Sequence, residues 1–591
     1  MRSSHKFSSE YGTVLLQRVG AGGRTEWLRF AAPERVFTAA QPGQVLDALA
    51  EIEAAVERGW HAAGLLAYEA SPAFDEVFVT RAPGPLPLLW FGLYREPEVL
   101  PHLPAAEGRF DIPRWLPSIS EDTYHAAIAR VKDYIAAGDT YQVNYTLRMR
   151  SAFAGDPLAL FTALHRAQRG AYSAYLDLGR HIVCSASPEL FFRLSGEEIV
   201  TRPMKGTAPR GLSWPDDEAR ARELQASAKN RAENVMIVDM IRNDLGRIAR
   251  TGTVTVRSLF DIERYLTLLQ MTSTVTAQTA APVREIFRAL FPCASITGAP
   301  KVRTMEIIAE LEESPRGVYT GCIGWWAPGR QAQFNVAIRT VQIDREAGRV
   351  EYGVGGGIVW DSVDRDEYRE CEVKARVLYA ESPEFRLLET LLWIPGRGYF
   401  LLDRHLQRLE NSTRYFGFRV NVEGIRARLL AAAAPLPAQR HRVRLLVDEE
   451  GGAVIETCPL ARSFPRTPWN VALASTPVNS RDRFLYHKTT HRAVYDAARA
   501  EHPDCDDVIL HNERGEVTES ALANIVARFG NDLVTPPVEC GLLAGTCRAR
   551  LLDRGCLREG IITLDDLQCA DAVYLVNSVR GWIPVNMECG G

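Results

Sequence analysis

Apolar residues recur along the chain with two different spacings, and the spacing changes from segment to segment. Apolar positions three and four residues apart predict helices over 122–137, 219–246 and about 363–380. Alternation of apolar and polar residues predicts a strand within 138–150 and a series of strands over 321–360. The order of these elements predicts a mixed fold, α/β and α+β, with much antiparallel pairing.

The pattern changes again near residue 382. Ser382 and Pro383 interrupt the preceding helix, and a new strand–turn–strand pattern follows them. A chain of 591 residues is also too long for one ordinary hydrophobic core. We therefore predict two domains, one over 1–382 and a smaller one over 385–591.

Composition excludes several classes of protein. Hydrophobic residues make up 46% and charged residues 24%, and a net charge of −4 leaves no basic stripe for nucleic acid. The sequence has no run of about 18 apolar residues, so we expect no membrane span. The N-terminal stretch MRSSHKFSSE lacks the apolar segment of a secretion signal, and the 11 cysteines form no CxxC pair. These features predict a cytoplasmic protein with reduced thiols.

The segment TRPMKGTAPRG, residues 201–211, places Lys205 between Pro203 and Gly206. A surface turn is one interpretation, because lysine usually points into water. The other is a lysine held against a substrate by a stiff loop, with its pKa lowered by neighbouring cations. The segment alone leaves both interpretations open.

Acidic residues on two predicted helices suggest a metal site. Glu367, Glu370 and Lys374 follow helical spacing along one face, and Glu233 lies on another helix, just before an apolar run. The simpler interpretation is a solvated face with a Glu370–Lys374 ion pair. Two carboxylates on separate helices can instead hold Mg²⁺ against an anionic substrate.

Two further segments are unusual for strands. Three successive glycines, Gly355–Gly357, weaken a strand and usually mark a close approach or a bulge. Arg339 alternates with apolar neighbours, so as a buried strand residue it would need a carboxylate partner, within the protein or on a ligand. Together with Lys205 and the acidic residues, these segments describe a pocket for a small dianion.

Six segments resemble the chorismate-utilising enzymes, which include anthranilate, isochorismate and salicylate synthases and aminodeoxychorismate synthase component I. The resemblance covers about 120–380 strongly and 1–120 weakly, and it implies a large β/α sandwich domain that binds chorismate. The segments, in chain order, are SASPELFFR, PMKGTAPRG, ENVMIVDMIRNDLGR, FPCASITGAPKVRTMEII, YGVGGGIVWDS and EYRECEVKA.

Three positions separate the members of this family. The loop around Lys205 is similar to the PIKGT loop of aminodeoxychorismate synthases, in which the lysine is a covalent nucleophile, whereas anthranilate synthases have PIAGT. Enzymes that add water tend to have lysine where this chain has Gln142. Anthranilate synthases share a histidine at the position where this chain has Gln270. All three positions favour the aminodeoxychorismate branch.

The resemblance also implies roles for individual residues. Lys205 would be the nucleophile, Glu189 the general acid, and Glu233 with Glu370 the ligands of Mg²⁺. The residues expected to bind chorismate are Arg339, Gly355, Gly356, Gly357, Thr297, Lys374 and Tyr319.

The second half carries a lysine, a later acidic residue, an arginine and a glycine turn before a predicted helix. Such a helix N-terminus suits a phosphate group. These features resemble the fold type IV pyridoxal-phosphate enzymes over about 385–591, a family that includes branched-chain and D-amino acid aminotransferases and aminodeoxychorismate lyase. The resemblance implies a pyridoxal phosphate site in which Lys488 forms the Schiff base and Glu519 pairs with the pyridine nitrogen. The other expected contacts are Arg408, Gly545, Thr546 and Asn524.

The two halves together predict a bifunctional enzyme that makes 4-aminobenzoate from chorismate and ammonia. No GxCxG-type segment is present, so we expect a separate glutamine amidotransferase to supply ammonia. Relatives of the second half commonly dimerise, which suggests a homodimer through this domain. The motifs of that half do not separate lyase from aminotransferase. An anthranilate-type synthase fused to an aminotransferase, and a binding protein without catalysis, remain alternatives.

Overall fold

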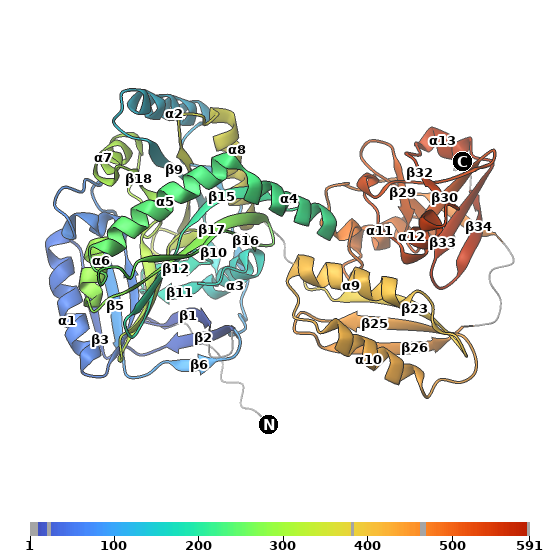
Figure 1. The fold of residues 1–591 in the computed structure, drawn as a ribbon, viewed down its shortest axis with the longest axis horizontal. Helices are drawn as coiled ribbons and strands as arrows, with labels where there is room; N and C mark the ends of the chain where they lie inside the picture. The colour runs from blue at the N-terminus through green and yellow to red at the C-terminus, as the bar shows by residue number, and fades with distance from the viewer. Residues whose placement is uncertain (1–9, 20–24, 380–382, 461–467, 588–591) are drawn as a thin grey trace. The chain divides into compact units, whose positions relative to one another are not determined.

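The computed structural model describes residues 10–19, 25–379, 383–460 and 468–587 and divides the chain into two compact units (Figure 1). The first unit is formed by Met1–Arg210 and Ala221–Ser382, and the second by Gly211–Arg220 and Pro383–Gly591. Residues 1–9, which were examined for a secretion signal, lie outside the described residues. So does residue 382, where we predicted the end of the first domain.

The first unit is built on two antiparallel ten-stranded sheets, which we call the first and second sheets. In spatial order, the first sheet is β18 (Gly298–Ala299), β9 (Gln142–Ala152), β22 (Arg349–Ile358), β21 (Thr340–Asp344), β12 (His181–Ser185), β11 (Ala174–Asp177), β1 (Val14–Val19), β2 (Thr25–Phe30) and β6 (Glu98–Leu100), with β8 (Leu116–Pro117) paired to β9. A separate pair joins β7 (Phe110–Asp111) and β10 (Ala154–Gly155).

The second sheet contains the strand that carries Lys205. In spatial order it is β15 (Met204–Pro209), β17 (Leu268–Gln278), β14 (Glu198–Arg202), β13 (Leu190–Ser195), β20 (Gln331–Val336), β19 (Cys322–Ala327), β4 (His61–Leu66), β5 (Leu89–Tyr94) and β3 (Arg35–Ala39), with β16 (Thr255–Arg264) paired to β17. The helices of this unit are α1 (Val45–Glu57), α2 (Glu121–Ala136), α3 (Pro157–Gln168), α5 (Ala228–Gly246), α6 (Val283–Leu290), α7 (Lys301–Leu311) and α8 (Asp364–Ala375). Helix α4 (Trp214–Ala226) is divided between the units, because its residues up to Arg220 belong to the second.

Two hydrophobic cores use opposite faces of the first sheet. On β1, Val14 and Leu16 belong to one core, together with residues of the second sheet and of α1, α5 and α6. Leu15 belongs to the other core, with residues of α2, α3 and α7. Because side chains alternate between the faces of a strand and both faces are covered, such strands read as continuous apolar runs.

The predicted long helix over 219–246 is wrong, because the chain forms two helices there. Ser227 has extended backbone angles (φ −62°, ψ 113°) and its hydroxyl accepts a hydrogen bond from the backbone N–H of Asn230. This N-cap starts α5 and ends the continuity with α4. The break leaves α5 packed against β15 and β17 (Figure 1). Glu233 of α5 lines the same cavity as Lys205 of β15.

The alternating pattern around Arg339 predicted a strand, but in the structure this residue lies between two strands. The chain leaves the second sheet at the end of β20 and enters the first at β21, and Arg339 occupies the crossing with a left-handed φ of +52°. That conformation is uncommon for a residue with a Cβ. Its Nη1 donates to the backbone carbonyl of Lys374, where the pattern had predicted a carboxylate partner.

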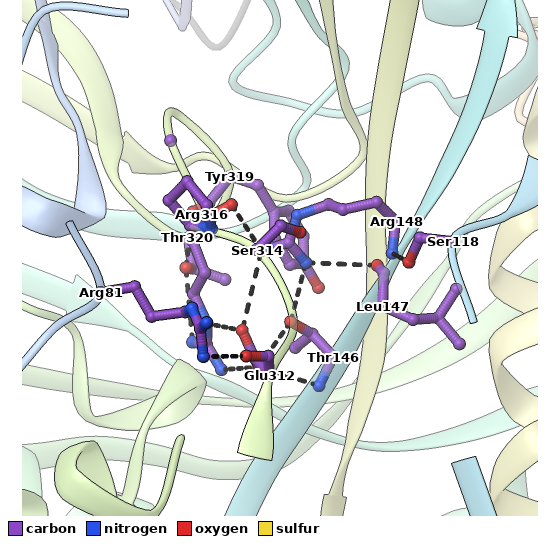
Figure 2. Close-up of polar contacts among 12 residues, drawn as sticks. Arg81, Ser118, Thr146, Leu147, Arg148, Glu312, Ser314, Arg316, Tyr319 and Thr320 are labelled. Atoms are coloured by element: carbon purple, nitrogen blue, oxygen red, sulfur yellow. Dashed lines mark hydrogen bonds and ion pairs between the residues drawn. The ribbon is translucent and has the colours of Figure 1, made fainter. Parts of the chain in front are cut away.

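A buried network of charges fixes β9 to the segment after α7 (Figure 2). Arg316 donates to Glu312 Oε1 at 2.6 Å, and the hydroxyl of Thr146 donates to the same oxygen at 2.7 Å. Arg148 donates to the Thr146 hydroxyl at 2.9 Å, and its guanidinium lies 5.1 Å from the ring centroid of Tyr319. The network therefore supports the ring of Tyr319, a predicted substrate contact, through Arg148.

The second unit has a four-stranded sheet and a larger mixed sheet. The smaller sheet is β24 (Gly398–Tyr399), β23 (Leu387–Ile394), β25 (His441–Val447) and β26 (Ala453–Pro459). The larger sheet is β29 (Val517–Ser520), β28 (Asp507–His511), β27 (Trp469–Leu473), β34 (Gly581–Met587), β33 (Ala572–Asn577), β30 (Asn524–Phe529), β31 (Asp532–Thr535) and β32 (Arg558–Glu559). Pairing of β29 with β30 closes six of these strands into a ring. The helices are α9 (Leu402–Phe416), α10 (Val422–Ala433), α11 (Ala493–Glu501), α12 (Thr546–Asp553) and α13 (Leu564–Gln568).

Across the residues that the structure describes, none of the helices combines the length and apolar character needed to cross a lipid bilayer.

The buried network generates a stability prediction. Glu312→Gln removes the negative charge between two buried guanidinium groups, and breaking a buried ion pair in this way costs roughly 3–5 kcal/mol. We expect the urea midpoint of the first unit to fall accordingly. Glu313→Gln, at the exposed neighbouring position, should leave the midpoint nearly unchanged. Equal midpoints for the two variants would contradict the importance given to the network.

Candidate active sites

Lys205 lies in an irregular part of β15 at a cavity of the first unit. The pairing of β15 with β17 shifts register between Met204 and Thr207, and Gly206 has a φ of +97°. The half-buried Lys205 side chain lines the cavity, and among the described residues its Nζ makes no hydrogen bond or ion pair. A bulge with a left-handed glycine re-aims the side chain beside it, so the irregular strand points this amine into the cavity.

The surroundings of Lys205 lower its pKa. Burial is the largest cause, and the charge of Lys374 acts in the same direction, whereas the charges of Glu233, Glu370 and Glu367 oppose the shift. A lowered pKa increases the fraction of neutral amine, which is the nucleophilic form.

Gly357 provides the space for this amine. A Cβ on Gly357 would lie 2.3 Å from Lys205 Nζ and 2.8 Å from Gln142 Nε2. Gly355 also lines the cavity, while a Cβ on Gly356 would face Glu367 instead. The three glycines therefore mark close approach by side chains on both faces of β22.

Glu189 is buried at the same cavity with its carboxyl group held by a serine. Ser295 Oγ donates to Glu189 Oε1 at 2.6 Å, and Cys293 Sγ lies 3.2 Å from that hydroxyl. Burial raises the pKa of Glu189 to about 7, although the hydrogen bond from Ser295 and the charge of Lys205 lower it. A carboxyl group with such a pKa can hold a proton and deliver it near neutral pH.

Three carboxylates besides Glu189 face the cavity: Glu233 from α5, and Glu367 and Glu370 from α8. Lys374 Nζ lies 2.6 Å from Glu370 Oε1, so the ion pair considered as an alternative is present. Mg²⁺ is usually held by one or two carboxylates and keeps water or substrate oxygens as its other ligands. By their chemistry Glu233 and Glu370 therefore fit the ion. The described residues contain no cluster of three acidic, histidine or cysteine side chains suited to a metal.

The other predicted chorismate contacts divide into two groups. Arg339, Lys374 and Tyr319 line the cavity, and Gly353 leaves room for Tyr319, because a Cβ there would lie 2.1 Å from its Cγ. Thr297 does not line the cavity, since its hydroxyl donates to the backbone carbonyls of Cys293 and Ala294.

Glutamines around the cavity carry information that the sequence alone did not. Gln142 is fully buried beside Lys205, and neither atom of its amide has a hydrogen-bond partner within the described residues. Gln168 lines the cavity, and its buried amide also has no hydrogen-bond partner within the described residues. Unpaired buried amides are costly, so both are candidate ligand contacts. The family resemblance already singled out Gln142, whereas nothing in the sequence singled out Gln168, and only the fold shows that both amides are unpaired.

Gln270 has a different environment. Its Nε2 donates to the carbonyl of Gly206 at 2.9 Å, and its Oε1 accepts from the hydroxyl of Thr207 at 3.1 Å. The side chain therefore braces the Lys205 loop.

In the second unit, Lys488 follows a short helical turn before α11 and its backbone carbonyl accepts from Leu388 of β23. Burial lowers the pKa of Lys488 to about 8, and the charges of Arg408 and Arg492 add to the effect. Among the described residues its Nζ makes no hydrogen bond or ion pair. This amine is available to react with a carbonyl group.

Glu519 lies on the closed ring of strands, with three donors around its carboxylate. Tyr495 Oη donates at 2.8 Å, Leu543 N at 3.1 Å and Asn524 Nδ2 at 3.2 Å. Burial nevertheless raises its pKa to about 7. A fixed carboxylate of this kind would pair well with a protonated ring nitrogen.

The predicted phosphate site is the start of α12. Gly545 is the N-cap residue, and a Cβ there would lie 1.8 Å from Asn524 Oδ1, so the position accepts only glycine. Arg408 donates to both oxygens of Glu389 and, at 3.3 Å, to the carbonyl of Ala544. Thr546 and Arg408 are thus gathered at one helix N-terminus, where a phosphate is favourable. The residues fit pyridoxal phosphate in their chemistry.

Comparison with known proteins matches two successive parts of the chain to two different families. Residues 16–380 match the family model of the chorismate binding enzymes, and residues 386–587 match that of amino-transferase class IV. Aminodeoxychorismate synthase component 1 of Bacillus subtilis is 40% identical over 274 residues, which are 46% of this chain and 57% of that protein. Anthranilate synthase component 1 of Thermus thermophilus is also 40% identical, over 268 residues, which are 45% of this chain and 57% of that protein.

The chain thus spans a little over half the length of these two relatives, and identity does not distinguish between them. The crystal structure of a 2,3-dihydroxybenzoate-specific isochorismate synthase, DhbC, from Bacillus anthracis aligns with a TM-score of 0.52 at 18% identity, covering 63% of this chain and 96% of that one. That likeness supports the fold of the first unit. The chain belongs to the chorismate-binding enzyme family and carries, in residues 386–587, a domain of the amino-transferase class IV family.

Proposed function

We propose that the chain makes 4-aminobenzoate in two steps, one in each unit. The first unit would convert chorismate and ammonia into 4-amino-4-deoxychorismate and water. The second unit would remove pyruvate from that product with pyridoxal phosphate. The observation that carries the proposal is the unpaired amine of Lys205, which lines the cavity together with Glu189.

In the first step, neutral Lys205 would attack ring carbon C2 of chorismate. The two ring double bonds would shift, the C4–oxygen bond would break, and Glu189 would protonate the departing hydroxyl group to give water. Ammonia would then bond to C4, the double bonds would shift back, and the C2–nitrogen bond would break to restore neutral Lys205. The ammonium group formed at C4 would return a proton to Glu189. Burial supports both roles, since it raises the pKa of Glu189 to about 7 and lowers that of Lys205.

The rest of the cavity suits a dianionic substrate. Arg339 and Lys374 supply positive charge, and Gly355 and Gly357 allow close approach. Mg²⁺ would be held by Glu233 and Glu370 and would neutralise part of the substrate charge. The two unpaired amides, Gln142 and Gln168, are further candidates for polar contact with substrate or ammonia.

An anthranilate-type synthase is the alternative for this unit, and two observations count against it. Lys205 occupies the position at which anthranilate synthases share an alanine. Gln270 replaces their histidine, and a glutamine amide cannot act as a base as an imidazole can, because it has no titratable group. Its amide instead makes hydrogen bonds to Gly206 and Thr207 of the Lys205 loop.

In the second unit, Lys488 would hold the cofactor covalently and move the proton during elimination. Bound pyridoxal phosphate would supply an electron sink for the electron pair left by that proton. With a pKa lowered to about 8, Lys488 can accept and return a proton near neutral pH. Tyr495, Asn524 and Leu543 would keep Glu519 oriented toward the pyridine nitrogen. An aminotransferase would use the same residues, and production of 4-amino-4-deoxychorismate by the first unit favours the lyase.

Two partners belong to the proposal. A separate glutamine amidotransferase would supply ammonia to the first unit, as the resemblance to component 1 proteins suggests. A second copy of this chain would pair through the C-terminal unit. The reactants are water-soluble metabolites, so we place the reaction in the cytoplasm.

Lys205→Ala tests the nucleophile. We expect amination of chorismate to fall by roughly three orders of magnitude or more, because no other group can take over the covalent role. Lys205→Arg should be equally inactive, since it keeps the charge but stays protonated. Without ammonium salt, intact-mass measurement of the wild type should detect a chorismate-minus-water adduct on Lys205. Lys132→Ala, on α2, is the control, and turnover by Lys205→Arg would refute the covalent role.

The pH profile tests Glu189. Its carboxyl group must be protonated to act as the acid, so kcat/KM for chorismate should decrease as the pH rises through about 7. Ser295→Ala removes a donor that stabilises the ionised form, so the pKa of Glu189 should rise and this decrease should move to higher pH. Ser295→Thr keeps the donor and should resemble the wild type. Rates are compared at constant free ammonia, and an unmoved profile in Ser295→Ala would exclude Glu189 as its source.

Lys488→Ala tests the second unit. We expect loss of the visible absorbance of the bound cofactor and accumulation of 4-amino-4-deoxychorismate, because the first step does not use this residue. Lys205→Ala should keep the absorbance and serves as the reciprocal control. If Lys488→Ala still released 4-aminobenzoate at the wild-type rate, this lysine would have no part in the elimination.

A further inference from the structure

A buried chain of hydrogen bonds connects Glu389 to the start of α12 through a histidine. His405 Nδ1 lies 2.7 Å from Glu389 Oε2, and His405 Nε2 lies 3.2 Å from the hydroxyl of Thr546. All three side chains are at most 5% exposed. The mechanism above gives His405 no task.

The charge of Glu389 determines which ring nitrogen of His405 carries the proton. Burial would raise the pKa of Glu389, but Arg408 and His405 outweigh it and lower the pKa to about 2. The carboxylate is therefore ionised near neutral pH and accepts a hydrogen bond from Nδ1–H. In neutral His405 the other nitrogen, Nε2, must then be an acceptor.

This tautomer fixes the direction of the Thr546 hydroxyl. A hydroxyl group has one proton, and Thr546 donates it to His405 Nε2, away from any anion at the helix N-terminus. If His405 takes up a proton, Nε2 becomes a donor to Thr546 Oγ1. The hydroxyl proton is then free to turn toward a phosphate oxygen.

We propose that His405 and Thr546 form a proton relay, in which binding of a phosphate dianion at the start of α12 is coupled to uptake of one proton from solvent by His405. The step forms one N–H bond, at His405 Nε2, with a proton from solvent, and the Thr546 hydroxyl proton only changes its acceptor. The inference rests on the cofactor site proposed above, because it takes α12 as the phosphate site.

The charges around His405 determine whether phosphate affinity increases or decreases with pH. Burial lowers its pKa, the positive charges of Arg408 and Lys488 lower it further, and Glu389 opposes them. His405 is therefore neutral in the empty site at pH 7 to 8, and a nearby dianion raises its pKa. Phosphate affinity should then decrease as the pH rises above neutrality, by up to about tenfold per pH unit.

Titration calorimetry of the full-length protein, freed of cofactor, tests this coupling with pyridoxamine 5′-phosphate as the probe. The probe has no aldehyde and cannot bond to Lys488. The measurements are made at about pH 8, where the phosphate is already a dianion. Comparison of two phosphate-free buffers of different ionisation enthalpy gives the number of protons that the protein takes up on binding. Lys488 also titrates in this range, so the wild type is compared with variants that all retain it.

His405→Gln cannot titrate and should take up fewer protons than the wild type, by up to about one per site. Thr546→Val is isosteric and lacks the hydroxyl, so it should show the same deficit and bind the probe about tenfold more weakly. Thr546→Ser keeps the hydroxyl and should behave as the wild type.

Two results would overturn the relay while leaving the cofactor site intact. One is binding with equal proton uptake in the wild type and His405→Gln. The other is wild-type uptake in Thr546→Val, which would mean that the phosphate acts on His405 without the hydroxyl. Failure of the wild type to bind the probe would instead overturn the proposed cofactor site, and the relay with it.

Discussion

Removal of an amine from water, without a partner to hold its charge, is the constraint on which both proposed sites depend. Lys205 and Lys488 each lie beside a carboxylate and an additional cation, and in both cases burial is the largest influence on the pKa. An ion pair with either amine would stabilise the charged form and suppress its reactivity. Burial therefore lowers the pKa of the lysine at both proposed sites, although the two units belong to different families.

Each amine needs rigid surroundings, because an unpaired lysine side chain could otherwise turn toward solvent. In the first unit, Gln270 braces the Lys205 loop from β17, and the Glu312 network supports Tyr319, which lines the same cavity. In the second unit, Glu389 holds His405 and Arg408 together at the start of α12. These residues lie behind the groups expected to touch ligand and set their orientation.

Much of the site was visible in the sequence because its residues lie in short contiguous motifs. The family resemblance is confirmed by both family models, and the Lys205 loop, the acidic helix and two of the three glycines, Gly355 and Gly357, meet at one cavity. The errors came where local pattern is ambiguous. Ser227 reads as a helix residue but caps α5, and Arg339 continues an alternating pattern although the chain changes sheets there. The unpaired state of the Gln142 and Gln168 amides was not visible in the sequence, since it results from long-range packing.

The most direct measurement incubates the purified protein with chorismate, Mg²⁺ and ammonium salt, with and without pyridoxal phosphate, and identifies the aromatic product by mass spectrometry. The account predicts 4-aminobenzoate and pyruvate when pyridoxal phosphate is present, and 4-amino-4-deoxychorismate as the main product of the cofactor-free protein. Anthranilate as the product would contradict the role of Lys205 and favour the alternative synthase.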